Sequence, residues 1–330
     1  MELDLETFLT TLYVIVDDLY QREIRPQMPP QGGPAPKLAD SEVLCLGLAA
    51  QWRRGVPWQS ERGCLRFVRK HGQALFPGLT SQSAFNRRLR RLWGALILLQ
   101  RAVAEERVSA LECEIMDGVP VRLAHGARSF HPRRLAEIAR IGKGGTDRYF
   151  YGLHLLLAVS STGIATGWTL AAANVQERWL AELLLSARAG CPQVTGPGGP
   201  RPGAARLAPP SDWVGPVQGC GRHSGKPLVA DLGFTGAEWQ AHWAADYGTT
   251  VITAPQDVPE AASRWLRSLR QVVETVFAHL CDSFGLQYPG AHTRWGLLTQ
   301  VAAKLAAFNL GLLINRSLGR PDFSFATLIV

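Results

Sequence analysis

Three acidic residues, Asp117, Asp231 and Glu274, stand in sequence contexts where carboxylates can do chemistry. Asp117 directly follows the strand-like stretch LECEIM, and Asp231 directly follows LVA, so each aspartate is predicted at the end of a β-strand. Glu274 lies in RQVVETVF, in the middle of a predicted long helix. Because open α/β sheets place their ligands at the carboxyl ends of their strands, we expect the two aspartates to meet there, with Glu274 brought to the same point by its helix.

A meeting of three carboxylates would form a metal site of oxygen ligands, which suits magnesium or manganese. In two-metal phosphoryl transfer, one ion activates the attacking water or 3′-hydroxyl group and the other stabilises the leaving oxygen. Taken alone, each acid has a plainer interpretation, since an aspartate after a strand commonly caps a turn and a helical glutamate is usually solvated. The neighbours of Glu274 are expected to face the sheet, where an unpaired carboxylate would be costly, and this favours the metal site.

The elements that must position these acids change character along the chain. Residues 1–108 carry apolar side chains at helical spacing and are predicted to form an all-helical domain. One long helix is predicted there over SQSAFNRRLRRLWGALILLQRAVAEERV, with Ser81 as its cap. Residues 109–330 give the predicted order β-β-β-α-β-α-β-α, which describes an α/β domain with a mixed sheet flanked by helices. A segment rich in glycine and proline at about 190–227 is interpreted as a flexible insertion in this second domain.

The chain carries an excess of positive charge, with a formal net charge of +8 and an isoelectric point near 9.5. Because clustered lysine and arginine displace the cations condensed on phosphates, this charge favours a nucleic acid as partner. The segment SQSAFNRRLRRLW is predicted to be a recognition helix, or alternatively a core helix with a solvated basic face, since Phe85, Leu89 and Trp93 give it an apolar stripe. Its residues expected to contact DNA are Arg87, Arg88, Arg90 and Arg91.

A second basic stretch runs from Arg122 to Arg148, after the strand that holds Asp117. We expect it to guide a DNA end toward the metal ions, and the plainer interpretation is a flexible loop. Its residues expected to contact DNA are Arg128, Arg133, Arg134, Arg140 and Lys143.

The start of the chain, MELDLETFLTTLYVIVDD, is acidic and interrupted by charge, unlike a secretory signal. No later run approaches the roughly 18 apolar residues of a membrane span, so we expect a cytoplasmic protein that makes no membrane contact. The six cysteines contain no C-x-x-C pair, which indicates neither a zinc knuckle nor a disulfide framework.

Around its three acids, the chain resembles bacterial insertion-sequence transposases whose DDE catalytic domain has the RNase H-like fold. The family's R-x-x-x-E signature on the third helix matches Arg270 and Glu274, which lie four residues apart and hence on one helix face. The family frequently has a lysine shortly after the glycine of the second strand, where this chain has His154. The resemblance covers about residues 110–315 and is carried, in the family's order, by MDGVPVRLAHGAR, YFYGLHLLLAVSSTGIATGWTLAAANV, LVADLGF, RQVVETVFAHLCDSFGL and RWGLLTQVAAKLAAFNL.

The resemblance implies a DNA transposase that cleaves double-stranded DNA at the terminal inverted repeats of a mobile element and joins the freed 3′ ends to target DNA. It implies two Mg²⁺ or Mn²⁺ ions held by Asp117, Asp231 and Glu274. Arg270 would contact a phosphate or orient Glu274. A homodimer is expected because two DNA ends must be paired, and the expected location is the bacterial nucleoid in the cytoplasm.

Two other functions stay open. A different metal-dependent nuclease with the same fold would cut DNA without joining it. A catalytically decayed protein would bind DNA without cutting it, and the retention of all three acids argues against this second alternative.

Overall fold

The computed structural model describes residues 2–28, 36–108, 113–124, 134–144, 149–189, 218–219, 226–253 and 260–329. Most of the predicted insertion at about 190–227 lies outside these residues, as do Arg128 and Arg133. The contacts within the chain divide it into two compact units. Unit 1 comprises Met1–Val103, His279–Leu286 and Trp295–Val330, and unit 2 comprises Ala104–Ala278 and Gln287–Arg294.

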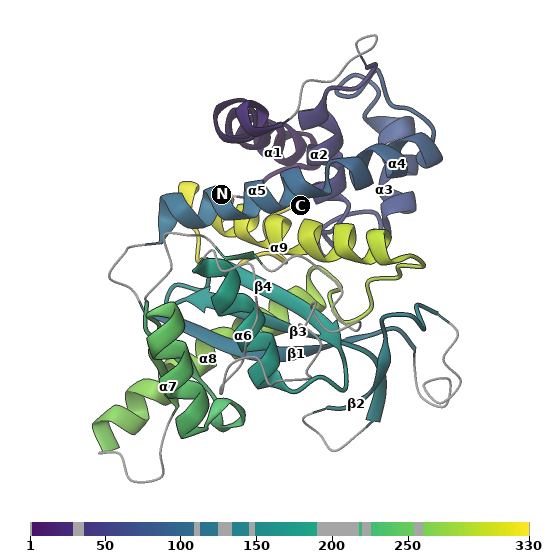
Figure 1. The fold of residues 1–330 in the computed structure, drawn as a ribbon. Helices are drawn as coiled ribbons and strands as arrows, with labels where there is room; N and C mark the ends of the chain where they lie inside the picture. The colour runs from purple at the N-terminus through teal and green to yellow at the C-terminus, as the bar shows by residue number, and fades with distance from the viewer. Residues whose placement is uncertain are drawn as a thin grey trace. The chain divides into compact units, whose positions relative to one another are not determined.

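Unit 1 is built from helices (Figure 1), as predicted for the N-terminal part of the chain. The predicted cap Ser81 begins α4, and its side chain accepts a hydrogen bond from the N–H of Ala84. The single long helix predicted after Ser81 is wrong, because the backbone at Leu92 (φ −89°, ψ 10°) leaves the helical conformation between α4 and α5. The helices are α1 (Leu5–Leu19), the π-helical turn η1 (Tyr20–Ile24), the 3-10 turn η2 (Arg25–Gln27), α2 (Asp40–Ala49), α3 (Glu61–His71), α4 (Gln82–Arg91), α5 (Trp93–Arg107) and α9 (Arg294–Ser317).

The C-terminal helix α9 belongs almost entirely to unit 1, whereas the predicted boundary at residue 108 assigns it to the second domain. Contrary to expectation, α9 is long and apolar enough to span a membrane, with a mean hydropathy of 1.6 over its best 18-residue window. However, 94% of that window is buried inside the protein, as in the core helix of a soluble protein. Its fully buried Lys304 donates a hydrogen bond of 2.9 Å to the side-chain oxygen of Gln51. We therefore interpret α9 as the core helix of unit 1.

Unit 2 contains a seven-stranded mixed sheet with the order β5-β4-β3-β1-β6-β7, and β2 pairs with β3 beside this path. Strands β1, β3, β4 and β5 pair antiparallel, whereas β6 is parallel to both β1 and β7. The sheet confirms the predicted mixed α/β architecture. The strands are β1 (Glu114–Arg122), β2 (Arg140–Lys143), β3 (Tyr149–Ser160), β4 (Ala165–Ala172), β5 (Gln218–Gly219), β6 (Leu228–Ala230) and β7 (Val251–Thr253).

Helices pack on this sheet next to the segments that hold Asp117 and Asp231. In Figure 1, α6 lies in front of the strands and α8 passes behind them. Buried leucine and valine side chains each stabilise such packing by about 1.5–3 kcal/mol. The helices are α6 (Glu177–Arg188), the 3-10 turn η5 (Leu232–Phe234), α7 (Ala237–Tyr247) and α8 (Glu260–Asp282). The core cluster under α6 and α7 includes Met116, Leu156 and Ala158 from the strands, Leu180 and Leu184 from α6, and Trp243 from α7.

Candidate active site

Asp117 and Asp231 occupy neighbouring positions on adjacent parallel strands. The register of β1 and β6 pairs Met116 with Ala230, so the next position on each strand is an aspartate. Asp231 follows the end of β6, as predicted. Asp117 does not end its strand, because β1 continues to Arg122 in antiparallel pairing with β3. The parallel pairing of β1 with β6 ends just before Asp117 and Asp231. The two aspartates therefore lie side by side on neighbouring strands.

Each aspartate is oriented by a local backbone amide. The Oδ1 atom of Asp117 accepts a 2.7 Å hydrogen bond from the N–H of Gly118. The Oδ1 atom of Asp231 accepts a bond of the same length from the N–H of Gly233 and so caps the short helix η5. The plainer interpretation of Asp231 as a cap is therefore correct, but it uses only one carboxylate oxygen. Within the described segments, the Oδ2 atom of each aspartate makes no hydrogen bond or ion pair.

Glu274 and Arg270 lie within electrostatic range of Asp117. The pKa of Asp117 is raised to about 6, chiefly by burial and also by the negative charges of Asp231 and Glu274. The hydrogen bond from Gly118 and the positive charge of Arg270 act in the opposite direction on the same pKa. Side chains from β1, α8 and the residue after β6 are thus coupled through their charges.

Glu274 itself is exposed on α8, while Val273 and Val276 on either side are buried. The expectation that burial would make this carboxylate costly is therefore wrong. Arg270 lies one turn earlier and is half-buried. The helix directs its apolar stripe into unit 2 and leaves Glu274 accessible from solvent.

A fourth carboxylate, which the sequence did not single out, lies beside the two aspartates. Glu177 is the first residue of α6, and its carboxylate approaches the backbone of Gly118 and of Gly233. The pKa of Glu177 is raised to about 7, chiefly by burial and also by the charges of Asp231 and Asp117. An acidic residue in the first turn of a helix is common, so the sequence held no signal that distinguished Glu177.

The donor set of this site consists of carboxylate oxygens, which suit Mg²⁺ or Mn²⁺. Across the described parts of the chain, no group of three or more His, Cys, Asp or Glu side chains is already assembled closely enough to hold an ion. Asp117 is coupled by charge to Asp231 and Glu274, and Glu177 is coupled by charge to both aspartates.

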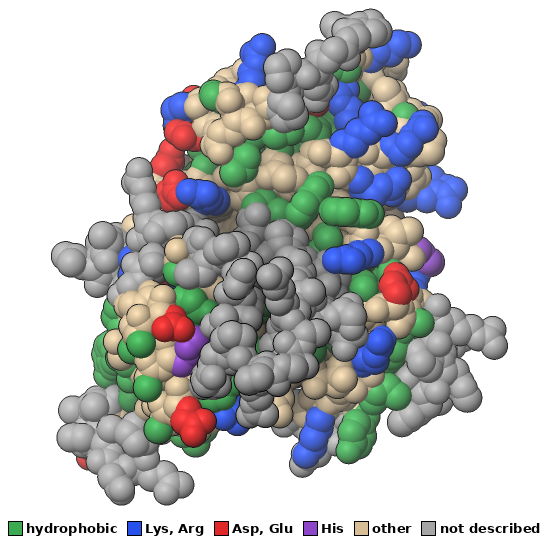
Figure 2. Space-filling view, in the orientation of Figure 1, with side chains coloured by type: hydrophobic (Ala, Val, Ile, Leu, Met, Phe, Trp, Pro, Cys, Tyr) green, Lys and Arg blue, Asp and Glu red, His purple; other side chains and the backbone are tan. Residues whose placement is uncertain are grey.

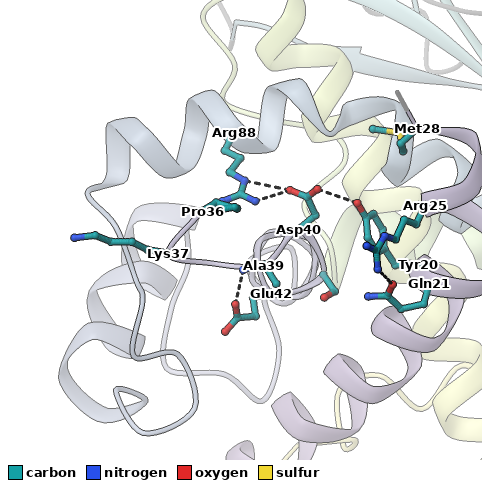
Figure 3. Close-up of a pocket in the computed structure, with 11 residues that line it drawn as sticks. Tyr20, Gln21, Arg25, Met28, Pro36, Lys37, Ala39, Asp40, Glu42 and Arg88 are labelled. Carbon is teal, nitrogen blue, oxygen red and sulfur yellow. Dashed lines mark hydrogen bonds and ion pairs between the residues drawn. The ribbon is translucent and has the colours of Figure 1, made fainter. Parts of the chain in front are cut away.

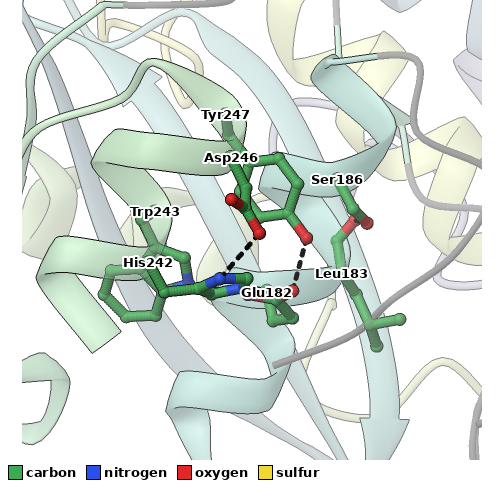
Figure 4. A network of polar contacts seen from close by, with 7 residues as sticks. All are labelled: Glu182, Leu183, Ser186, His242, Trp243, Asp246 and Tyr247. Carbon is green, nitrogen blue, oxygen red and sulfur yellow. Dashed lines mark hydrogen bonds and ion pairs between the residues drawn. The ribbon is translucent and has the colours of Figure 1, made fainter. Parts of the chain in front are cut away.

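A buried network joins α6 to α7 (Figure 4). Glu182 on α6 is fully buried, and one of its oxygens accepts a 2.8 Å bond from Trp243 Nε1. The hydroxyl of Tyr247 and, at 3.0 Å, the Nε2 atom of His242 also contact the Glu182 carboxylate. The other ring nitrogen of His242 lies 2.9 Å from Asp246. This network fixes the helix that begins with Glu177 against the helix that follows Asp231.

The basic residues of α4 differ in their surroundings. Arg87 and Arg91 are exposed, one helical turn apart, and Figure 2 shows Lys and Arg gathered over the region of α3 and α4. Arg90 is half-buried. Arg88 instead points to Asp40, with Nη2 2.6 Å from Oδ1, beside a cavity of about 740 Å³ (Figure 3). Arg88 thus has an intramolecular partner. The exposed basic surface of α4 is formed mainly by Arg87 and Arg91.

The second basic stretch is described only in part. The Nη2 atom of Arg134 lies 2.6 Å from Nε2 of His292, and Arg140 donates hydrogen bonds to backbone oxygens of Ala136 and Ala139. Lys143 is exposed at the end of β2. Arg134 and Arg140 thus have partners within unit 2.

In comparisons with known proteins, no family model, no curated protein and no solved structure matches this chain.

Proposed function

We propose that this chain is a DNA transposase of the DDE type and that unit 2 is its RNase H-like catalytic domain. The observation that carries the proposal is the register of β1 and β6, which brings Asp117 and Asp231 to adjacent positions where the parallel pairing ends. The charge coupling of Asp117 with Glu274 and Arg270 on α8 adds support. Unit 2 also contains the strands and helices predicted from the sequence in their predicted order, with β2 and β5 added.

The site fits two Mg²⁺ or Mn²⁺ ions, which Asp117, Asp231 and Glu274 would hold. Both aspartates keep one oxygen outside any hydrogen bond or ion pair of the described chain. When bound, such ions supply an activated water or 3′-hydroxyl nucleophile and neutralise charge on the leaving oxygen.

The remaining roles fall to positively charged side chains. Arg270 shares a helix face with Glu274, so it can bind a DNA phosphate next to the carboxylates. Arg87 and Arg91 present an exposed basic face that suits the phosphate backbone of double-stranded DNA. We further propose a homodimer that pairs two element ends and acts on DNA in the bacterial nucleoid.

The test is incubation of the full chain with Mg²⁺ and the DNA that flanks its own gene, comparing wild type with Asp231→Asn. We expect the wild type to yield cleaved ends and joined products. Asp231→Asn should lower cleavage at least about a hundredfold, because metal ligation contributes several kcal/mol to such reactions. Its DNA affinity should change less than about threefold, since phosphate contacts carry that affinity. Glu238→Gln, an exposed acid on α7, is the matched control and should cleave as wild type does.

The products distinguish the alternatives. Cleavage without joined products would indicate a metal-dependent nuclease. Binding without cleavage by the wild type would indicate a decayed DNA-binding protein. Equal cleavage by wild type and Asp231→Asn would contradict the carboxylate site itself.

A further inference from the structure

On the basis of the function proposed above, we propose that Glu177 is a fourth carboxylate ligand of the metal site formed by Asp117, Asp231 and Glu274. The resemblance to the DDE family assigns no role to this residue. The assignment follows from the position of Glu177 at the start of α6 and from its contact with Gly118 and Gly233.

Glu177 lies between the backbones next to the two aspartates. A Cβ atom added to Gly118 would come within 3.0 Å of Glu177 Oε1, and one added to Gly233 would come within 2.5 Å of Oε2. Gly118 directly follows Asp117, and the N–H of Gly233 is bonded to Asp231. One oxygen of Glu177 therefore faces the segment of each aspartate.

The two glycines leave the space that the Glu177 carboxylate occupies. Neither Gly118 nor Gly233 has a positive φ, so the backbone does not require glycine at either position. Real Cβ atoms essentially never approach another atom to 2.5 Å, so a side chain at residue 233 would displace the carboxylate. The absence of side chains at both positions thus accommodates Glu177.

The local structure of α6 does not account for this carboxylate. The N-cap is Gln176, which makes no side-chain capping bond, and Glu177 makes no hydrogen bond or ion pair with any described residue. A half-buried carboxylate beside two others, without a partner, carries a free-energy cost. A divalent cation between Glu177 and the aspartates would offset that cost, and oxygen ligands of this type are those that Mg²⁺ and Mn²⁺ prefer.

The experiment measures Mn²⁺ binding to the full chain without DNA, by electron paramagnetic resonance of the free ion. We expect Glu177→Gln to weaken Mn²⁺ binding about tenfold or more, because it removes a charged ligand while keeping the side-chain size. Asp231→Asn should weaken binding as well, and Glu238→Gln should bind as wild type does. Thermal unfolding with EDTA checks the fold of each variant.

A second variant, Glu177→Asp, separates ligation from a structural role. Aspartate keeps the charge favoured in the first turn of a helix, so a purely structural role would survive the change. It withdraws the carboxylate by one methylene group, so a ligand role predicts several-fold weaker Mn²⁺ binding at unchanged stability. If Glu177→Gln fails to fold, Glu177→Asp still tests whether Glu177 is a metal ligand.

The outcomes of the two proposals differ. Normal Mn²⁺ affinity in both Glu177 variants, with reduced affinity in Asp231→Asn, would overturn the role of Glu177 and leave the proposed function intact. Tighter binding by Glu177→Gln would also overturn it, because Glu177 would then repel or block the site rather than ligate the ion. Normal affinity in Asp231→Asn as well would contradict the proposed function too.

Discussion

Asp117 and Glu177 connect pH to the stability of unit 2. Burial and neighbouring charges raise the pKa of Asp117 from 3.8 to about 6 and that of Glu177 from 4.5 to about 7. A carboxyl group whose pKa is higher in the folded protein binds more protons when folded. The free energy of unfolding therefore falls as pH rises through this window.

We expect the contribution of these two groups to stability to be present below about pH 4 and to be lost between about pH 4 and pH 7. The measurement is urea unfolding in EDTA across this range for wild type and the double variant Asp117→Asn, Glu177→Gln. As pH rises, the free energy of unfolding should fall more for the wild type than for the double variant. Excess Mg²⁺ should reduce that shift, because a bound cation stabilises the ionised carboxylates. A pH-independent difference would show that the two groups do not titrate in this way.

Among single residues, those with a local signal could be predicted from the sequence. Asp231 follows a short apolar run and does follow β6. Glu177 could not be predicted, because its neighbours Gly118 on β1 and Gly233 in η5 are distant in the sequence and meet it only in the folded protein. The same holds for Arg88, whose partner Asp40 begins a different helix.

Between elements, the network around Glu182 determines how α6 and α7 pack. We expect Glu182→Ala to lower the free energy of unfolding by about 3–5 kcal/mol, because it leaves Trp243 Nε1 and the Tyr247 hydroxyl buried without their acceptor. Urea unfolding followed by tryptophan fluorescence measures this loss.

The control for this change is Glu238→Ala, which removes an exposed acid from α7 and should alter stability by no more than about 0.5 kcal/mol. Equal unfolding midpoints for Glu182→Ala and wild type would contradict the stabilising role of the network. Weaker Mn²⁺ binding by any folded Glu182 variant would show that α6 must be held in place for Glu177 to act.

At the level of elements, the mixed sheet and its flanking helices could be predicted, because strand and helix periodicities differ clearly along the second part of the chain. The break at Leu92 could not, since the apolar stripe continues from α4 into α5. The periodicity of apolar residues indicates which face of a helix is buried, but it says little about where the helix axis changes direction. The placement of α9 in unit 1 could not be predicted either, because it depends on contacts with the beginning of the chain.

For the molecule as a whole, the net charge of +8 should appear as a salt-dependent affinity for DNA. We expect the double variant Arg87→Ala, Arg91→Ala to bind DNA more weakly and to reduce the slope of log affinity against log salt by about 1.8, that is about 0.9 for each lost phosphate contact. Fluorescence anisotropy with a labelled duplex at several salt concentrations measures the slope.

Arg88→Ala is the matched control on the same helix. Its DNA affinity and salt slope should stay near those of the wild type, because Arg88 is paired with Asp40. Its stability should fall by about 1–3 kcal/mol, since Asp40 loses a mostly buried partner. A salt slope reduced equally by Arg88→Ala would argue against a surface centred on Arg87 and Arg91.

The position of α9 has a consequence for biosynthesis. The first helices of unit 1 leave the ribosome long before residues 295–330, which belong to the same unit, and the bridge between Leu3 and Ile329 forms only after residue 329 has emerged. At a translation rate of about 5–20 residues per second, the apolar faces of the early helices stay unpaired with α9 for about ten seconds or more. During translation these faces are a natural target for chaperones, and a ribosome that stops before α9 would release a chain whose N-terminal helices cannot bury their core.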